Sequence, residues 1–193
     1  MNFINLKILA LTCYLFLSPP QDKIEWSENI QLTWEDFKGR PNNSQWYGAL
    51  SKLAISYRFN IPAKDNAQVE IKTVFYPEES WVKPKEKTGS LLSHENLHFD
   101  IAELYARKIR KEIKKYFDRT NKSDVQKLNK KFSKIYNKTY DDYEKYQQLY
   151  DKETAYSTNK KEQDRWEGKI EKELVELKEY SSSKIKIDLT KSN

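Results

Sequence analysis

Two histidines and a glutamate are the residues of this chain best suited to chemistry. They are His94, Glu95 and His98, in the order His-Glu-Asn-Leu-His. On a helix, side chains four residues apart project from one face, so both imidazoles can bind a single cation. Glu95, rotated by about 100° from His94, can instead accept a proton from a water on that cation. This spacing is typical of zinc metalloproteases, and the chain has no third histidine.

A catalytic zinc site needs a third protein ligand besides an open position for water. Since no histidine remains, this ligand must be a carboxylate or a tyrosine. Asp100 and Glu103 lie on the motif helix itself, and Asp100 lies well around that helix from the two histidines. The segment Tyr150–Tyr156 is better placed, at the end of the next predicted helix.

The elements that must position these residues follow from periodicity. Apolar residues recur every three or four positions from Leu91 for about 25 residues, which predicts a long amphipathic helix carrying the motif. The same period predicts a second helix over 125–150. A third follows Asn159, which with Glu162 forms a plausible capping pair.

Before the motif the period is two. Leu53 to Phe59 and Val69 to Phe75 alternate apolar and polar residues, and Pro62 to Asn66 forms a turn between them. We therefore predict an antiparallel hairpin, with a short helical turn near Trp34 further upstream. The expected fold is α+β and zincin-like, a small antiparallel sheet packed on three long helices. An edge strand of the hairpin is a candidate for binding substrate backbone by strand addition.

The N-terminus has the form of a secretory signal. Lys7 precedes the apolar run Ile8–Leu17, and Pro19-Pro20 end it. This run is too short to span a bilayer, which takes about 20 apolar residues. Thr12 before Cys13, and the apolar run continuing past it, argue against a lipid anchor at Cys13. We predict residues 1–20 as a signal peptide, 21–180 as one domain and 181–193 as a polar tail.

Composition limits the classes of function. The chain has 193 residues, enough for one domain with a core. Its net charge is +6, but basic and acidic residues interleave, as around Lys108–Glu112. That pattern is typical of a solvated helix surface, and it argues against nucleic-acid binding, where charge gathers in one stripe. Without Cys13, the mature protein has no thiol chemistry.

Several blocks of the sequence resemble a bacterial family of predicted secreted zinc-dependent proteases, domain of unknown function 922. The blocks are Trp34–Pro41, Ser80–Val82, Leu91–Glu103, Tyr105–Arg107, and Tyr150-Asp151 with Glu153-Thr154, Asn159, Gln163 and Trp166. The resemblance covers most of the chain from about Trp34 to Leu174. It implies a zinc-dependent protease with His94 and His98 as ligands and Glu95 as general base.

One position departs from the family pattern. A histidine usually stands two residues after the Glu-Thr pair, where this chain has Tyr156. If that histidine is the third ligand, Tyr156 or Glu153 must replace it. If the glutamate is the ligand, little is lost. We expect Glu153 as the third zinc ligand and Tyr156 as a candidate catalytic residue that stabilises the oxyanion.

The resulting hypothesis is an exported zinc metallopeptidase, secreted or periplasmic, acting on a peptide or protein substrate. An exported zinc-binding or partner-binding protein without turnover is the alternative, and an association with the cell envelope fits either. A purely structural helical protein of the envelope is the third. Metal content separates the third hypothesis from the others, and chelator-sensitive hydrolysis separates the first from the second.

Overall fold

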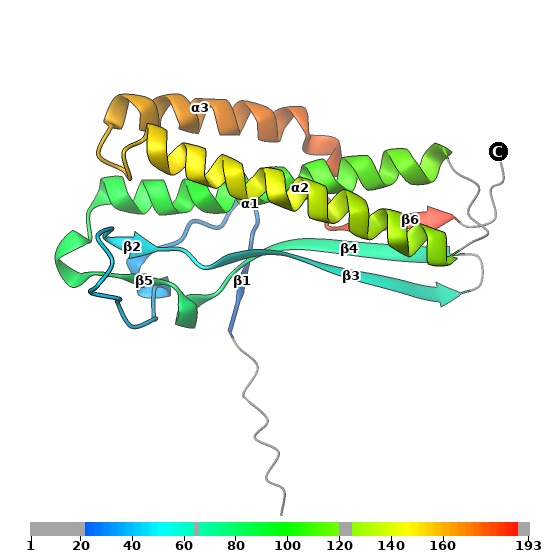
Figure 1. Cartoon of the computed structure of the whole chain (residues 1–193), viewed down its shortest axis with the longest axis horizontal. Coiled ribbons are helices and arrows are strands. Elements are labelled where there is room, and N and C mark those ends of the chain that lie inside the picture. Colours follow the sequence, from blue (N-terminus) through cyan, green and yellow to red (C-terminus); the bar gives the residue numbers. More distant parts are fainter. Residues whose placement is uncertain (1–21, 64–65, 120–124, 189–193) are drawn as a thin grey trace, which may run out of the picture.

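The fold is known from a computed structural model, which describes residues 22–63, 66–119 and 125–188. Three long helices lie on one face of an antiparallel sheet (Figure 1). They are α1 (Gly89–Arg119), α2 (Val125–Glu153) and α3 (Lys160–Glu176). The predicted α+β class, with a small antiparallel sheet on three helices, is confirmed.

The main sheet is built around the predicted hairpin. Strand β3 (Leu53–Ala63) pairs antiparallel with β4 (Asn66–Phe75), in a register that sets Leu53 opposite Phe75. On its other side, β4 pairs with β6 (Lys184–Asp188) along its first half and with β1 (Ile24–Glu25) at its end. Strand β4 is therefore central, and β3 lies at an edge of the sheet.

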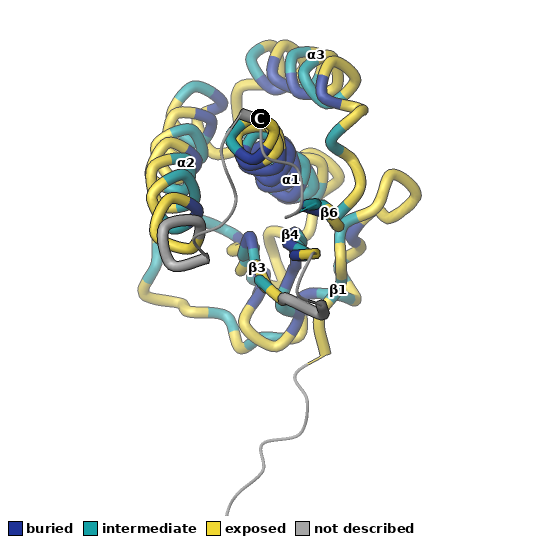
Figure 2. The backbone as a smooth tube through the Cα atoms, turned by 90° about the vertical axis from the view of Figure 1, so that its right-hand side faces the viewer, coloured by how far each residue is buried: buried dark blue, intermediate teal, exposed yellow. Residues whose placement is uncertain are grey.

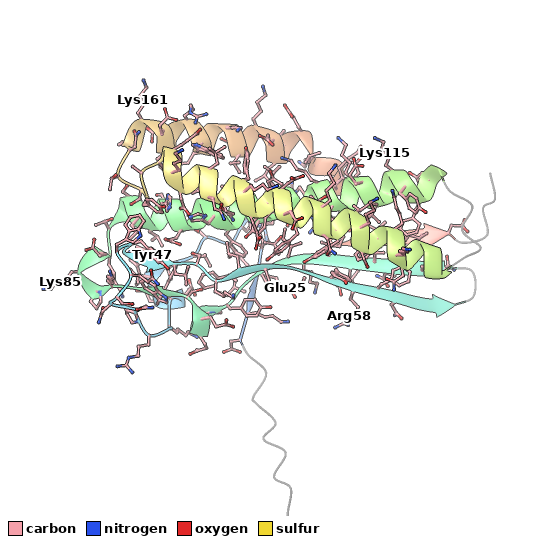
Figure 3. All side chains as sticks on the ribbon, viewed as in Figure 1. Glu25, Tyr47, Arg58, Lys85, Lys115 and Lys161 are labelled. Atoms are coloured by element: carbon pink, nitrogen blue, oxygen red, sulfur yellow. The ribbon has the colours of Figure 1, made fainter. Side chains whose placement is uncertain are left out.

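A second, two-stranded sheet lies beside the start of α1. It consists of β2 (Ala49–Leu50) and β5 (Trp81–Val82). Three short 3-10 helices connect the elements of this region, η1 (Trp34–Asp36), η2 (Pro77–Glu79) and η3 (Pro84–Glu86). Helix η1 confirms the predicted turn near Trp34. Tyr47 lies at this end of the molecule, whereas Arg58 and Lys115 project outward toward the other end (Figure 3).

Helix α1 is the centre of the core. It lies between α2, α3 and the sheet, and Figure 2 shows that many of its residues are buried. The apolar positions that predicted this helix are buried, namely Leu97, Ile101, Leu104, Tyr105, Ile109, Ile113 and Phe117. Because α1 is covered on several sides, the polar side chains on it are also drawn into the interior. That burial sets the environment of the motif.

The end of the chain differs from the predicted polar tail. After α3, the 3-10 helix η4 (Lys178–Tyr180) leads into β6, whose residues pair with Asn66–Glu70 of β4. Ile187 is buried and Ile185 packs against the main core. The alternation of apolar and polar residues therefore completes the sheet, and the folded unit extends beyond residue 180.

The predicted capping pair of α3 is confirmed, since the Asn159 side chain accepts a hydrogen bond from the Glu162 backbone amide. The predicted signal segment 1–20, including Cys13, lies outside the described residues. In the part of the chain that the structure describes, no helix combines the length and apolar character needed to cross a membrane.

Candidate metal centre

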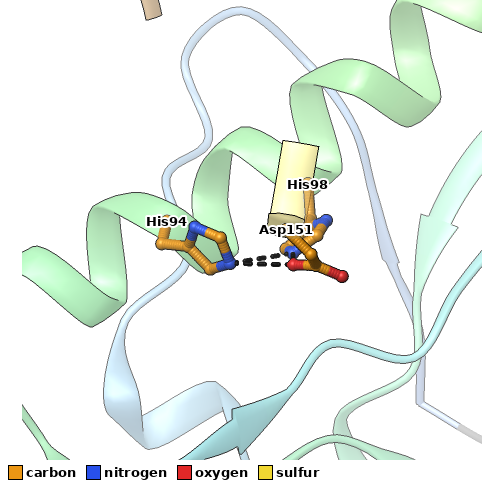
Figure 4. A group of neighbouring side chains, drawn as sticks. All are labelled: His94, His98 and Asp151. Atoms are coloured by element: carbon orange, nitrogen blue, oxygen red, sulfur yellow. Dashed lines mark hydrogen bonds and ion pairs between the residues drawn. The ribbon is translucent and has the colours of Figure 1, made fainter. Parts of the chain in front are cut away.

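His94 and His98 lie one turn apart near the start of α1 and present their Nε2 atoms to each other at 3.1 Å. Asp151, from the last turns of α2, completes a triangle (Figure 4). Its Oδ1 lies 3.1 Å from Nε2 of His94 and 3.0 Å from Nε2 of His98. These three residues, the metal triad below, bring three potential ligand atoms to one point.

The antiparallel packing of α2 on α1 brings Asp151 to the histidines. Contacts between the two helices occur in reversed order: His94 meets Asp151, His98 meets Gln147, and Tyr105 meets Tyr143 further along. Gln147 and Asp151 are four residues apart and so share one face of α2. Their partners on α1, His94 and His98, are also four residues apart, so the two helices match each other over one turn.

The outer nitrogen of His98 is held by Gln147. The Gln147 Oε1 lies 2.6 Å from Nδ1 of His98, while its Nε2 donates to the His98 carbonyl at 3.0 Å. This second hydrogen bond orients the amide, so Oε1 is the atom that faces the ring. An amide oxygen can only accept, and Nδ1 of His98 must therefore carry a hydrogen.

The outer nitrogen of His94 is held in the same way by α3. The Gln163 Oε1 lies 3.3 Å from Nδ1 of His94 and accepts the Tyr150 hydroxyl at 2.8 Å. Gln163 Nε2 donates to Glu167 at 2.9 Å, which orients this amide too. The Tyr150 ring stacks on the His94 ring, with centroids 4.5 Å apart. Both histidines thus carry their hydrogen on Nδ1.

With hydrogens on Nδ1, the two imidazoles in their neutral form would point Nε2 lone pairs at each other and at the Asp151 carboxylate. Three acceptor atoms 3.0–3.1 Å apart repel one another unless a positive charge lies among them. A tetrahedral zinc ion with bonds of about 2.0–2.1 Å holds its ligand atoms about 3.4 Å apart. The triad differs from that spacing by only a few tenths of an ångström, so two nitrogens and one oxygen fit a metal ion.

The pKa values of His98 and Asp151 are shifted in the directions expected where a positive charge is favoured. Burial by itself would lower the pKa of His98, but the hydrogen bond and charge of Asp151 outweigh it and raise the pKa to about 9. Burial would likewise raise the pKa of Asp151, yet hydrogen bonds from both histidines hold it well below its usual range. Both shifts show that this point of the structure favours a positive charge.

The triad belongs to the part of the chain that a family model matches. The model is described as a bacterial protein of unknown function (DUF922), and it matches residues 27–158. The chain belongs to the DUF922 family. No curated protein and no solved structure matches it. The match confirms the family suggested by the sequence blocks, and its range includes the whole triad.

In this DUF922 protein, the predicted ligand Glu153 does not reach the histidines. Its Oε2 accepts hydrogen bonds from Trp166 Nε1, at 2.8 Å, and from Arg165, both on α3. Two residues along a helix correspond to a rotation of about 200°. When Asp151 faces α1, Glu153 must therefore face the opposite way. The structure places Asp151 in the position expected for Glu153.

Two features of this DUF922 protein were within reach of sequence reasoning but not resolved by it. Asp151 lies in the segment Tyr150–Tyr156, where the third ligand was expected, but only the helix phase selects it. Of the supporting glutamines, Gln163 belongs to the sequence blocks that resemble the family but had no role assigned to it. Gln147 has no such signal, although it lies four residues before Asp151. Asp100 lies away from the triad, as expected, and its carboxylate accepts the Trp26 indole hydrogen at 2.7 Å.

Glu95 lies beside the triad without joining it. Its side chain is buried, and its Oε2 accepts a hydrogen bond of 2.6 Å from the Ser51 hydroxyl. Ser51 lies between β2 and β3, so the sheet region orients the carboxylate from the side opposite α2. Glu95 and the triad line one cavity of about 690 Å³. A carboxylate held at the wall of that cavity can exchange a proton with a molecule bound there.

The cavity runs between a strand segment and a helix face. One wall is formed by Trp46–Leu53, which includes β2 and the start of β3. The other wall consists of α2 residues, namely Tyr140, Tyr143, Glu144, Gln147, Gln148 and Asp151. The motif residues of α1 form its floor, and Tyr156 lines it from the turn after α2.

Tyr156 is held at the cavity by the way α2 ends. Its backbone amide donates to the Asp151 carbonyl at 2.9 Å, and the Ala155 amide donates to the Lys152 carbonyl. This pair of bonds is a Schellman motif. Ala155, Tyr156 and Ser157 have positive φ angles of 45°, 52° and 75°, a conformation that costs of order 1–3 kcal/mol per non-glycine residue. The same turn thus positions Tyr156 and the backbone of Asp151.

Proposed function

We propose that this protein is a zinc-dependent metallopeptidase in which His94, His98 and Asp151 bind the metal. The observation that carries the proposal is the convergence of three acceptor atoms beside a buried glutamate in an open cavity. Two imidazoles and one carboxylate match the donor set of catalytic zinc sites, which keep one position open. The amides of Gln147 and Gln163 supply the supporting hydrogen bonds that ligating histidines usually have.

In this proposal the chain's own residues divide the work of hydrolysis. A zinc ion, when bound, polarises the peptide carbonyl and makes water more acidic. Glu95 accepts the proton of the attacking water and then donates it to the departing amine nitrogen. Ser51 fixes the glutamate in position through its hydrogen bond. The Tyr156 hydroxyl is the candidate donor to the carbonyl oxygen as negative charge develops there.

The first experiment measures metal content. We expect about one zinc per chain after mild purification, determined by elemental analysis. Asp151→Ala should lose most of this zinc, whereas Glu153→Ala should keep it, because Glu153 contacts α3. Asp164→Asn, which changes an exposed carboxylate on α3, is the control. Zinc that depends on Glu153 and not on Asp151 would contradict the assignment.

The second experiment separates hydrolysis from binding. Glu95→Gln keeps the size of the side chain but removes the base, so it should retain zinc and fold while losing hydrolysis by about a hundredfold or more. Tyr156→Phe tests the hydroxyl in the same assay. If the wild-type protein binds zinc but shows no chelator-sensitive hydrolysis of a broad peptide library, it is a metal-binding protein without turnover. If it binds no metal, it is a structural helical protein.

Export is part of the proposal and has its own test. The basic residue and apolar run before Pro19 predict a secreted or periplasmic protein, with an association with the envelope as one form of it. Residues 1–25 fused to a reporter active only after export should give activity. An inactive reporter in the cytoplasm would refute the export signal and leave the metal site unaffected.

A further inference from the structure

Two aromatic side chains stand at the cavity without being buried. Trp46 is 68% exposed and Tyr156 is 39% exposed, and both line the cavity that contains the metal triad. Their rings meet edge to face, with centroids 4.2 Å apart. A binding site typically combines exposed apolar surface of this kind with a few polar groups, here those of the metal triad.

Both aromatic residues have backbones that are fixed by neighbouring contacts, although their side chains are exposed to solvent. Trp46 precedes Tyr47, whose ring stacks on Trp81 of β5 with centroids 5.5 Å apart. The backbone next to it is tied to the residue that follows β5 as well, since the Lys83 side chain donates to the Gln45 carbonyl. The Schellman turn fixes Tyr156 in an unfavourable backbone conformation. The pair is therefore preorganised by parts of the chain that are distant in sequence.

The length of the cavity indicates where the pair lies along a bound chain. The cavity wall on α2 extends from Tyr140 to Asp151, which at 1.5 Å per residue is about 16 Å. An extended peptide rises about 3.3 Å per residue, so about five residues fit along it. Tyr156 follows Asp151, and the aromatic pair therefore lies at the triad end of this cavity.

The charges of the cavity disfavour an acidic side chain at that end. Glu95, Glu144 and Asp151 all line it, and Lys52 is the basic residue among the lining side chains of the described chain. A bound divalent cation would offset the carboxylates close to the triad. An acidic side chain of a ligand would still gain nothing from the rings of Trp46 and Tyr156, whereas an apolar or aromatic one would bury surface against them.

We propose that Trp46 and Tyr156 form a subsite for a large apolar side chain, such as Phe, Tyr, Trp or Leu, of a peptide ligand. The inference rests on the proposed peptidase function for its substrate. It adds that the peptide ligand carries an apolar residue either next to the peptide bond that lies at the metal triad or one position further along. Trp46 is the specificity-determining residue, because it is the more exposed of the two rings.

The test measures binding separately from hydrolysis. Fluorescent octapeptides with one Phe moved through a Gly/Ser background, and matched peptides with Ala or Asp in its place, are titrated by anisotropy. The zinc-loaded Glu95→Gln variant serves as host, so that nothing is cleaved. We expect one Phe position to bind about tenfold tighter than its Ala match. Adding Trp46→Ala should reduce that ratio to about threefold or less.

Two controls accompany the double variant. Trp46→Phe should retain most of the preference, since it keeps an aromatic ring. Val175→Ala removes another exposed apolar side chain, on α3 and away from this cavity, and should leave the ratio unchanged. Zinc content must stay the same in all of these variants, which shows that the triad is intact.

The outcomes distinguish this inference from the proposed function. Equal binding of Phe and Ala peptides at every position, or a ratio unaffected by Trp46→Ala, overturns the subsite even if the wild-type protein hydrolyses peptides. A Phe preference that disappears with Trp46→Ala supports the subsite even if the wild-type protein hydrolyses nothing. In that second case the peptidase proposal fails and the subsite belongs to a peptide-binding protein.

Discussion

Helix α1 carries two buried polar clusters that differ in how their hydrogen bonds are satisfied. The motif cluster contains His94, Glu95 and His98 in the first turns, and the charge cluster contains Glu103, Arg107 and Arg110 in the middle. All but the half-buried His98 are at most 4% exposed. The side chains of the two clusters are buried to a similar extent, so burial alone does not distinguish the clusters.

In the charge cluster, donors meet acceptors. The Glu103 carboxylate accepts hydrogen bonds from Arg107 Nε at 3.1 Å, Arg110 Nη1 at 2.7 Å and Thr73 Oγ1 at 3.0 Å. The arginines also donate to backbone carbonyls of Leu174, Ile71 and Tyr180. Among the buried side-chain nitrogens and oxygens of the described residues, only Arg107 Nη2 lacks a hydrogen bond, and Glu28 lies 3.5 Å from it. This cluster joins α1 to the sheet and to the end of α3.

In the motif cluster, acceptors meet acceptors. The glutamines satisfy the outer nitrogens of the histidines, while the inner nitrogens and Asp151 converge beside an open cavity. A buried polar group that is matched by its neighbours stabilises a fold, whereas one that is left for a cation or a ligand indicates a function. Glu103, although it lies on the motif helix, is therefore a structural residue and not a ligand.

The largest expected effect comes from breaking the charge cluster. Glu103→Ala leaves two buried guanidinium groups without their carboxylate and should lower the free energy of unfolding by about 3–5 kcal/mol, measured by urea denaturation. Glu25→Ala removes an exposed partner of Lys72 and should cost at most about 1 kcal/mol. Similar losses for the two variants would contradict a structural role for the charge cluster.

Metal removal should act on the motif cluster and leave the charge cluster intact. With free zinc at about a hundredfold above its dissociation constant, chelation should lower the free energy of unfolding by about 2.7 kcal/mol. Hydrogen exchange should then increase over the first turns of α1 and the end of α2, but not around Glu103. A uniform increase along α1 would show that the two clusters are not independent.

A smaller effect is expected from the amide that orients His98. Gln147→Ala removes the acceptor at Nδ1 and should weaken zinc binding by about 10- to 100-fold, measured by competition with a chromophoric chelator. Gln148→Ala changes the next residue, which is exposed, and should leave zinc affinity as it is. Equal affinities for the wild type and Gln147→Ala would mean that the glutamine does not orient the ligand.

The smallest effect concerns the turn that ends α2. Ala155 occupies the left-handed position of the Schellman motif, where glycine has no Cβ conflict. Ala155→Gly should raise the free energy of unfolding by at most about 1 kcal/mol. The relief of backbone strain in the folded state is partly offset by the larger conformational entropy of the unfolded chain. Thermal unfolding measures it. A clear loss of stability would show that this backbone is not strained.

The local features of this protein can be predicted from short stretches of its sequence. The i, i+4 spacing of His94 and His98 placed both imidazoles on one helix face, and the period-two runs predicted the β3–β4 hairpin. The cap at Asn159 was also readable, because each of these features depends on residues close together in the chain.

Which distant residues complete the site depends on how the helices and strands pack. Asp151 and Glu153 were equally available in the sequence, and the rotation of α2 against α1 turned one toward the histidines and the other toward α3. In the same way, the predicted polar tail forms strand β6 because the first half of β4 has an edge on which it can pair. Helix phase and sheet pairing are fixed by packing over the whole fold, which no local pattern contains.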